Sequence, residues 1–173
     1  MNVPKRPAAL LIVAQAICLL AVPLTLLGIL LSVYPTCLYI CQADFFQYDN
    51  TLIVALFGVA RTLRDAILGG LLVWVEIEAF CVCGRVRKAS AFSAENAKAL
   101  GRIALLLTLA GLMTLLFGDG LIPFLLNGLP PVAPIVERLL LPFMLLTFAG
   151  MLRAVQLLMR RALDMQDEIN LTV

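Results

Sequence analysis

Four long apolar runs, separated by more polar connectors, dominate the pattern of hydrophobic and polar positions along the chain. They lie at about residues 8–33, 66–83, 103–122 and 135–157. Each is close to the roughly 20 residues that an α-helix needs to cross a bilayer. Because lipid cannot satisfy exposed backbone groups, the runs are expected to be helical. The pattern predicts an all-α integral membrane protein, a four-helix transmembrane bundle forming a single transmembrane domain over residues 1–173.

The first run resembles the apolar part of a cleaved signal peptide, because Lys5 and Arg6 precede it. Its length favours a different interpretation. From Ala8 to Val33 it exceeds the roughly 7–15 residues of a signal peptide's apolar region, and no clear cleavage site follows its first half. We therefore predict a retained membrane anchor.

Charged residues interrupt the apolar pattern that leads into the second run. A single helix from Leu52 to Cys83 would be roughly 50 Å long. We therefore expect residues 52–62 to form a separate interfacial helix or a helical extension, followed by the span at 66–83. Arg61 and Asp65 are four residues apart, which predicts that they pair on one helix face.

The basic residues are distributed unevenly between the connectors, and this predicts the orientation. Lys and Arg precede the first run, fill residues 84–102 and follow the fourth run, whereas residues 34–60 and 118–134 contain neither. The positive-inside rule then places both termini, the connector 84–102 and the tail 158–173 in the cytoplasm. The predicted outer loops are 34–65 and 123–134.

Composition agrees with a membrane protein and argues against an enzyme. Hydrophobic residues make up 62% of the chain and charged residues 14%, and the mean hydropathy is +1.03. The chain has no His, no Gly-rich phosphate loop after a strand and no G-x-S-x-G motif. We expect no enzymatic activity, no cofactor and no metal site.

Two carboxylates, Glu76 and Glu78, fall within the second run, where an unpaired charge costs several kcal/mol. They are two residues apart and so point to different sides of a helix. Arg102 and Arg153 are the predicted partners of Glu78. Glu76 either joins a similar interhelical pair or is protonated, because burial favours the neutral acid. Together these four residues form a predicted intramembrane polar site, either structural or part of a proton or cation pathway.

Small residues and cysteines give weaker indications. Pairs such as Gly69 with Gly70 predict close helix packing, and Gly150-x-x-x-Ala154 predicts one packing face. Cys37 and Cys41 lie in the predicted outer loop and are candidates for a local disulfide, although a regular helical turn would strain it.

The cytoplasmic connector and tail form the predicted docking surface for a soluble partner. Ser93 is expected to cap a helix that leads into the third span, with Glu95 in its first turn. The end Ile169–Val173 alternates apolar and polar residues and is β-prone, which suits either a partner's groove or sheet edge, or a frayed terminus. Anionic lipid headgroups are the alternative ligand for the basic residues. The predicted docking residues are Arg85, Arg87, Lys88, Phe92, Ser93, Glu95, Asn96, Arg160, Arg161, Leu171, Thr172 and Val173.

The run from Phe92 to Ile103, FSAENAKALGRI, together with the terminal Leu171-Thr172-Val173 after an acidic tail, resembles an uncharacterised bacterial family of small four-span membrane proteins. The family commonly has a Gly in the turn before its Phe, where this chain has Lys88-Ala89-Ser90-Ala91. Members are often encoded beside a short helix-turn-helix regulator. The resemblance implies a protein of the bacterial cytoplasmic membrane that acts on a transcription factor.

Two functions from different classes follow as hypotheses. The first is a regulatory or scaffolding protein that holds a small cytoplasmic helix-turn-helix regulator, without binding nucleic acid itself. The second is a small transporter or channel subunit that uses Glu76 and Glu78. Both involve the lipid bilayer, and a homo-oligomer is compatible with either.

Overall fold

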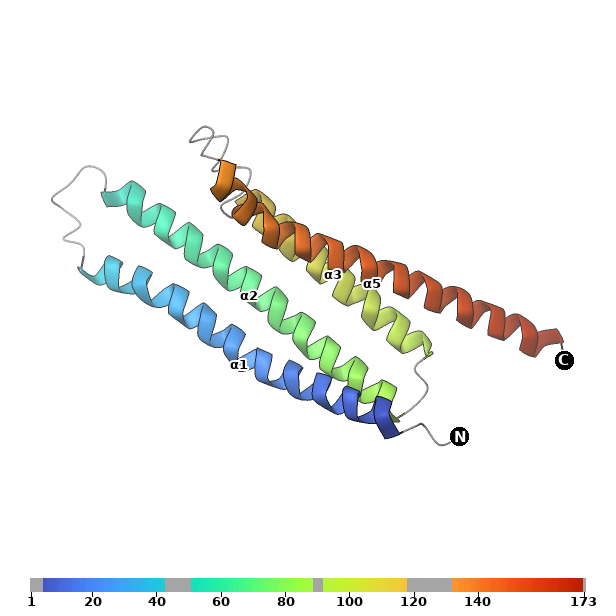
Figure 1. Cartoon of the computed structure of the whole chain (residues 1–173). Helices are drawn as coiled ribbons and strands as arrows, with labels where there is room; N and C mark the ends of the chain where they lie inside the picture. The colour runs from blue at the N-terminus through green and yellow to red at the C-terminus, as the bar shows by residue number, and fades with distance from the viewer. Residues whose placement is uncertain (1–4, 43–50, 89–91, 118–131, 173) are drawn as a thin grey trace.

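The computed structural model describes residues 5–42, 51–88, 92–117 and 132–172, and each stretch carries one helix. Helix α1 spans Lys5–Gln42, α2 spans Thr51–Lys88, α3 spans Ala94–Phe117 and α5 spans Val132–Thr172. Figure 1 shows all four as long rods. The predicted all-α fold with four long apolar helices is confirmed.

Each helix contains a stretch that is long and apolar enough to cross a membrane. These stretches are Ala9–Tyr34, Gly58–Arg87, Ala94–Phe117 and Leu139–Ile169. At 1.5 Å per residue they extend roughly 36–46 Å, more than the roughly 30 Å of a hydrocarbon core. They can therefore cross a bilayer with some tilt, or with their ends in the headgroup region.

The helices are longer than the predicted spans. Helix α1 continues to Gln42, into the predicted outer loop, and α2 runs from Thr51 without a break. The predicted alternative of a separate interfacial helix at 52–62 is therefore wrong, whereas a helical extension of the span is present. Helix α5 includes Thr172, so the predicted β-prone end is helical. The helices continue because no Gly or Pro interrupts residues 59–68 or 158–172. A continued helix also satisfies its own backbone groups where water is scarce.

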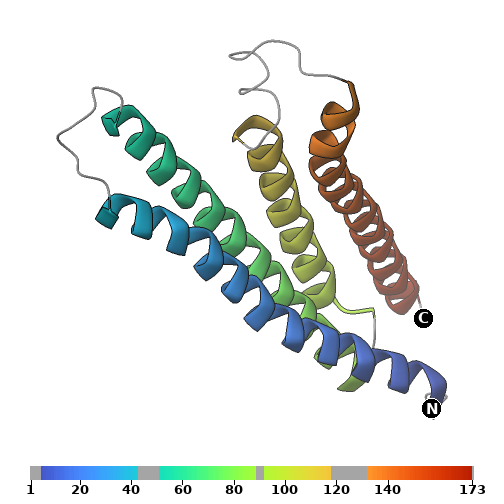
Figure 2. The same ribbon diagram turned by 60° about the vertical axis from the view of Figure 1, so that its left-hand side comes forward.

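The four helices lie side by side in their order along the chain (Figures 1 and 2). Helix α1 packs on α2, α2 on α3, and α3 on α5. Among the described residues, no other pair of helices has its backbones in close contact. Helices α1 and α5 therefore form the two edges of the molecule.

The core lies between the middle helices and α5. Ile103 and Leu107 of α3 and Ala149 of α5 form its centre. Partly buried residues packed against it come from α2 and α5: Leu72, Val75, Ala79, Val82, Leu145 and Leu152. In the candidate span of α1, by contrast, no residue is buried. Its apolar side chains are positioned to face lipid.

Small residues set the closest approaches between helices. A Cβ placed on Gly69 of α2 would overlap the side chain of Ile29, and one on Gly111 of α3 would lie 2.9 Å from Cγ of Leu146. Gly150 is exposed and meets no atom within 4 Å, and Ala154 is also exposed. The predicted Gly150-x-x-x-Ala154 packing face is therefore wrong within this chain, because Ala149, one position earlier, is the residue turned toward α3.

An arginine connects α2 and α3 at the end of the molecule where α3 finishes. Arg64 forms an ion pair with Asp65 at 2.6 Å and donates a hydrogen bond to the backbone carbonyl of Phe117 at 3.0 Å. The carbonyl belongs to the last turn of α3, which has no backbone donor of its own there. Asp65 thus pairs with Arg64, and the predicted pair with Arg61 is wrong.

Candidate functional site

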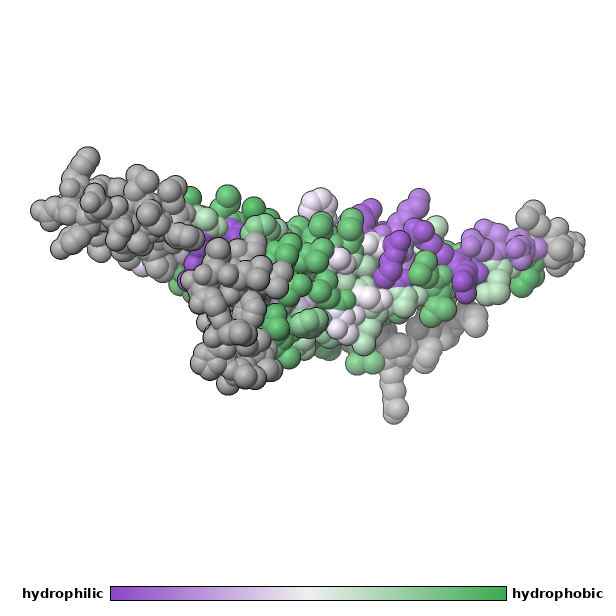
Figure 3. Space-filling view, turned by 90° about the horizontal axis from the view of Figure 1, so that it is seen from above, coloured by the Kyte–Doolittle hydropathy of each residue, from purple (hydrophilic) through white to green (hydrophobic). Residues whose placement is uncertain are grey.

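Polar side chains gather toward one end of the molecule, here called the basic end and defined as residues 84–88, 92–102 and 153–172. It combines the last turns of α2, the first turns of α3 and the last turns of α5. In Figure 3, hydrophilic atoms cluster on this side, next to a hydrophobic middle. The residues predicted from the sequence as docking residues lie here, with Val173 outside the described residues.

The start of α3 is fixed by a helix cap and an ion pair. The Ser93 hydroxyl accepts a hydrogen bond from the Asn96 amide at 3.2 Å, and its carbonyl accepts one from Ala97 at 3.0 Å. Arg85 reaches from α2 to Glu95 at 3.8 Å. Ser93 is thus the N-cap that its sequence position predicts. The cap fixes the start of α3, and the ion pair ties that start to the end of α2.

Arg102 bonds to Glu78 through two contacts that join α3 to α2. Its Nε lies 2.9 Å from Oε1, and its NH2 group donates to Oε2 at 3.0 Å. The Glu78 side chain is only 15% exposed, whereas that of Arg102 is 54% exposed. The bidentate geometry neutralises the more deeply buried carboxylate.

Glu76 has a different environment on the other side of α2. Its Oε1 lies 2.7 Å from the hydroxyl of Thr25 on α1. The same hydroxyl lies 3.1 Å from the Ala21 carbonyl, one helical turn earlier. Oε2 of Glu76 is buried and has no hydrogen-bond partner in the part of the chain that the structure describes. The two glutamates therefore do not share a site.

A second polar cluster joins α3 and α5. Arg153 donates a hydrogen bond of 2.5 Å to Oε1 of Gln156, whose residue is only 1% exposed. The Gln156 carboxamide lies against Gly101, where a Cβ would overlap it. Arg153, one of the two predicted partners of Glu78, is thus engaged within α5 instead.

The predicted docking residues differ in accessibility. Asn96 is only 1% exposed, so it is not available to a partner, and this prediction is wrong. Its place in the first turn of α3, directly after the cap, turns it toward the core. The side chains of Phe92, Glu95, Arg87, Arg160 and Arg161 are exposed. The side chains of Lys88, Leu171 and Thr172 lie outside the described residues.

Among the described side chains, the cysteines form no disulfide. The backbone is helical at Cys37 and Cys41, and their side chains lie outside the described residues, so the disulfide stays a prediction. Cys18, Cys81 and Cys83 are free thiols. Among the described residues, no group of three or more Cys, Asp or Glu side chains is placed to hold a metal ion.

Comparison with known protein families gives a match over nearly the whole chain. A family model described as "Protein of unknown function (DUF2975)" matches residues 5–173. The chain belongs to this family. No curated protein and no solved structure was found to match. Membership in DUF2975, with four candidate membrane-crossing helices, agrees with the predicted uncharacterised family of small four-span proteins.

In this DUF2975 protein, two polar residues and one glycine that sequence reasoning missed make or adjoin key contacts: Thr25, Gln156 and Gly101. Thr25 is a single polar residue within an apolar stretch, and Gln156 lies among apolar residues between Arg153 and Arg160. Gly101 is the small residue of α3 that lets the Gln156 side chain approach. Which residue each one meets depends on how the helices are aligned, and spacing along one helix does not give that alignment.

Proposed function

We propose that this protein is a non-enzymatic, multi-pass protein of the bacterial cytoplasmic membrane that holds a small cytoplasmic helix-turn-helix regulator through its basic end. In this proposal both termini are cytoplasmic, as the distribution of basic residues predicts. The partner class comes from the family resemblance in residues 92–103 and 171–173. The protein itself supplies a docking surface and makes no contact with nucleic acid.

The observation that supports docking is the length of α5 beyond its neighbour. Gly101 lies against Gln156 and Gly111 against Leu146, so α3 and α5 run antiparallel in a constant register. Continuing this register places Ala94, the first residue of α3, opposite Leu163. Residues 164–172 of α5 therefore extend past α3 by roughly 13 Å at 1.5 Å per residue. Figure 1 shows this end of α5 reaching beyond the other helices.

The end of α5 from Leu158 onward, which includes the projecting residues, has the surface of a helix that pairs with another helix. Met165 is 56% exposed and Leu158, two turns earlier on the same side, is 66% exposed. Charges flank these apolar residues: Arg160 and Arg161 come first, and Asp164, Asp167 and Glu168 follow, all exposed. An amphipathic partner helix carrying acidic residues opposite the arginines and basic residues opposite the carboxylates would complement this surface.

The test is capture of the purified regulator encoded beside the gene, by the full-length protein in nanodiscs. We expect Met165→Lys to weaken capture at least about tenfold, since it puts a charge in the apolar contact. Reversing Arg160 and Arg161 to Glu should weaken it further and reduce its salt dependence. A matched pair of alanine variants, Met165→Ala and Met144→Ala, provides the control. Alanine is used because a lysine at Met144 would place a charge in lipid.

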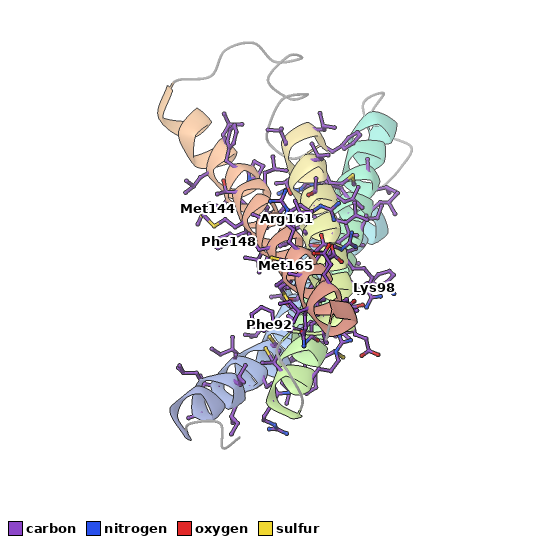
Figure 4. The ribbon with its side chains drawn as sticks, turned by 90° about the vertical axis from the view of Figure 1, so that its right-hand side faces the viewer. Phe92, Lys98, Met144, Phe148, Arg161 and Met165 are labelled. Atoms are coloured by element: carbon purple, nitrogen blue, oxygen red, sulfur yellow. The ribbon has the colours of Figure 1, made fainter. Side chains whose placement is uncertain are left out.

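Met144 is exposed on the same helix, and Figure 4 shows that it points away from α3, as Phe148 does. Met165→Ala should lower capture, and Met144→Ala should leave it unchanged. Equal capture by all variants would overturn the docking proposal. If capture requires anionic lipid in the nanodiscs and does not change with these substitutions, the regulator binds the lipid headgroups and not the basic end.

A small transporter or channel subunit remains the second candidate, and one observation favours it. Glu76 places within the candidate span of α2 a buried carboxyl oxygen that has no hydrogen-bond partner among the described residues. Glu78 no longer supports a transport pathway, because Arg102 neutralises its charge. Ion or proton flux in liposomes, compared between the wild type and Glu76→Gln, tests this candidate, and equal flux would exclude it.

A further inference from the structure

Helices α1 and α2 pack side by side and run antiparallel (Figures 1 and 2). Toward one end of the pair, Ile29 of α1 meets Gly69 of α2. Toward the other end, Gln15 of α1 meets Gly84 of α2. Residue numbers therefore fall along one helix as they rise along the other, and this register determines which side chains share a level between the two contacts.

The register brings two cysteines to one level. Between the two glycine contacts, the hydroxyl of Thr25 lies 2.7 Å from Oε1 of Glu76. Cys18 precedes Thr25 by seven residues, and Cys83 follows Glu76 by seven residues. Because seven residues make nearly two helical turns, each cysteine lies on the same side of its helix as the residue of that contact. Cys18 and Cys83 therefore face each other, roughly 10 Å further along the helices toward the basic end.

The two facing thiols are close together, free and partly shielded. They are near enough for a charge on one sulfur to act on the other. Both are half-buried and neither is in a disulfide, whereas Cys81 is exposed. Two residues along a helix differ by about 200° in direction, so Cys81 points away from the interface that Cys83 faces.

This donor set restricts the kind of ligand that the thiols can hold. Two thiolates side by side repel each other, and a cation between them removes the repulsion. Structural Zn²⁺ takes four ligands, but the chain has no His, and no group of three or more Cys, Asp or Glu in the described part of the chain could hold a metal ion. Soft thiolate ligands favour Cu(I), a monovalent ion that accepts two sulfurs.

We propose that Cys18 and Cys83 bind one Cu(I) ion between α1 and α2. Each thiol releases its proton and its sulfur donates an electron pair to the metal, so one Cu(I) enters, two protons leave and no electron is transferred. Cys83 adjoins the basic end, which the orientation proposed above places in the cytoplasm, where thiols stay reduced. Spacing along the chain does not predict this site, because the two cysteines come from different helices.

The bound ion would connect α1 to the rest of the molecule. Among the described helices, α1 packs on α2 alone. Since the ion has one ligand on each helix, it favours the state in which α1 is docked. The site lies between α1 and α2, apart from the end of α5 that the proposed regulator contacts.

The first test measures Cu(I) binding by the full-length protein in nanodiscs, with a reductant present and in competition with bicinchoninate, a coloured Cu(I) chelator. Cys37 and Cys41 are changed to Ser throughout, so that Cys18, Cys81 and Cys83 are the remaining thiols. We expect one Cu(I) per chain. Cys18→Ser and Cys83→Ser should each weaken binding at least about a hundredfold, because removing a ligand costs more than removing an outer hydrogen-bond partner.

Cys81→Ser is the matched control and should bind Cu(I) as tightly as the parent protein. Unchanged binding by Cys18→Ser would assign the ion to α2 alone, and equal losses in Cys81→Ser and Cys83→Ser would remove the distinction between the two sulfurs. Either result would overturn the proposal. X-ray absorption at the copper edge tests the site in the parent protein without relying on a variant: two sulfur neighbours are expected, and three or more would exclude this site.

The second test asks whether the ion holds α1 in place. In the protein that retains the three thiols, Cu(I) should slow hydrogen exchange of the α1 amides near Cys18 at least about tenfold, because the ion binds the docked state. The same amides in Cys18→Ser should not respond to Cu(I). Equal slowing in both proteins would overturn the proposal. Neither test uses the regulator, so failure of regulator capture and failure of this proposal are distinguishable.

Discussion

The two outer helix pairs, α3 with α5 and α1 with α2, are held together by different means. The first pair encloses buried residues from both helices, among them Ala110 and Ala149, which are 0% and 3% exposed. It also contains the buried amide of Gln156. In the candidate span of α1 no residue is buried. That helix is attached through the approach of Ile29 to Gly69 and through the contact between Thr25 and Glu76.

This difference indicates how stability is distributed in the molecule. Lipid is as apolar as the side chains, so burial of apolar area contributes little to helix association in a membrane, and close packing and polar bonds decide it. Helices α2, α3 and α5 share one core of buried residues, to which α1 contributes none. We expect α1 to be the helix that separates most readily, and α3 with α5 to be the last pair to separate.

The largest effect is expected from overfilling the contact between α3 and α5. Gly111→Leu would bring side-chain atoms into Leu146 and against Leu145. We expect it to lower the free energy of unfolding by about 2–3 kcal/mol. Gly150→Leu is the matched control on an exposed position with no atom within 4 Å, and it should be neutral. Unfolding in detergent by titration with dodecyl sulfate measures both, and equal effects would mean that Gly111 is not at a packed interface.

A smaller loss is expected when the ion pair between α2 and α3 is broken. Arg102→Gln leaves the carboxylate of Glu78, which is 15% exposed, without its bidentate partner. Because the guanidinium is half exposed, we expect a cost of about 1–2 kcal/mol, below that of a fully buried pair. Adding Glu78→Gln should restore part of the loss in the same unfolding assay. A double variant that is no more stable than Arg102→Gln would show that the two side chains do not interact.

Much of the fold follows from the apolar runs, because the bilayer imposes both the length and the helical state of a span. Three of the predicted spans lie within observed helices, and the remaining one, 103–122, lies on α3 as far as Phe117, where the described residues end. The ends of the predicted spans differ from the ends of the helices, because an apolar run ends at the first charged residue whereas the helical backbone continues past it. Arg61, Arg64 and Asp65 end the apolar pattern, yet α2 passes through them, and Arg64 and Asp65 satisfy each other's charge on the helix.

The polar contacts were less accessible to sequence reasoning. Glu78 needs a cation at its depth, which limited the choice to two arginines, and the structure has Arg102 there. The sequence did not limit the choice of partner for Glu76 in this way, because its neighbour Thr25 carries no charge and lies on another helix. Alignment of α1 with α2 depends on Ile29 meeting Gly69. That contact is one of many that the small residues of the chain would permit.

A loss of about 1 kcal/mol is expected from Thr25→Val, which keeps the shape of the side chain and removes the hydroxyl. The effect should be confined to the docking of α1, since Thr25 contacts Glu76 and not the core shared by the other helices. Thr147→Val is the matched control, because that exposed hydroxyl bonds only to the carbonyl of Phe143 in its own helix. Hydrogen exchange of the α1 amides measures the difference, and equal exchange in both variants would argue against a role for the Thr25 contact.

The smallest effect is expected at the cap of α3. Ser93→Ala removes the acceptor of the Asn96 amide, and the loss of a cap typically costs about 0.5–1 kcal/mol. Ser93→Asp keeps an acceptor at the helix start and should preserve stability. The ion pair between Arg85 and Glu95 still holds the connection, so fraying should be limited to the first turn, up to about Ala97. Faster exchange of the amides in that turn, with the rest of α3 unchanged, is the expected result. If exchange accelerates throughout α3, the cap also supports the packing of α3 on α5. The greater stability of this pair, compared with α1 and α2, would then depend partly on the Ser93 cap.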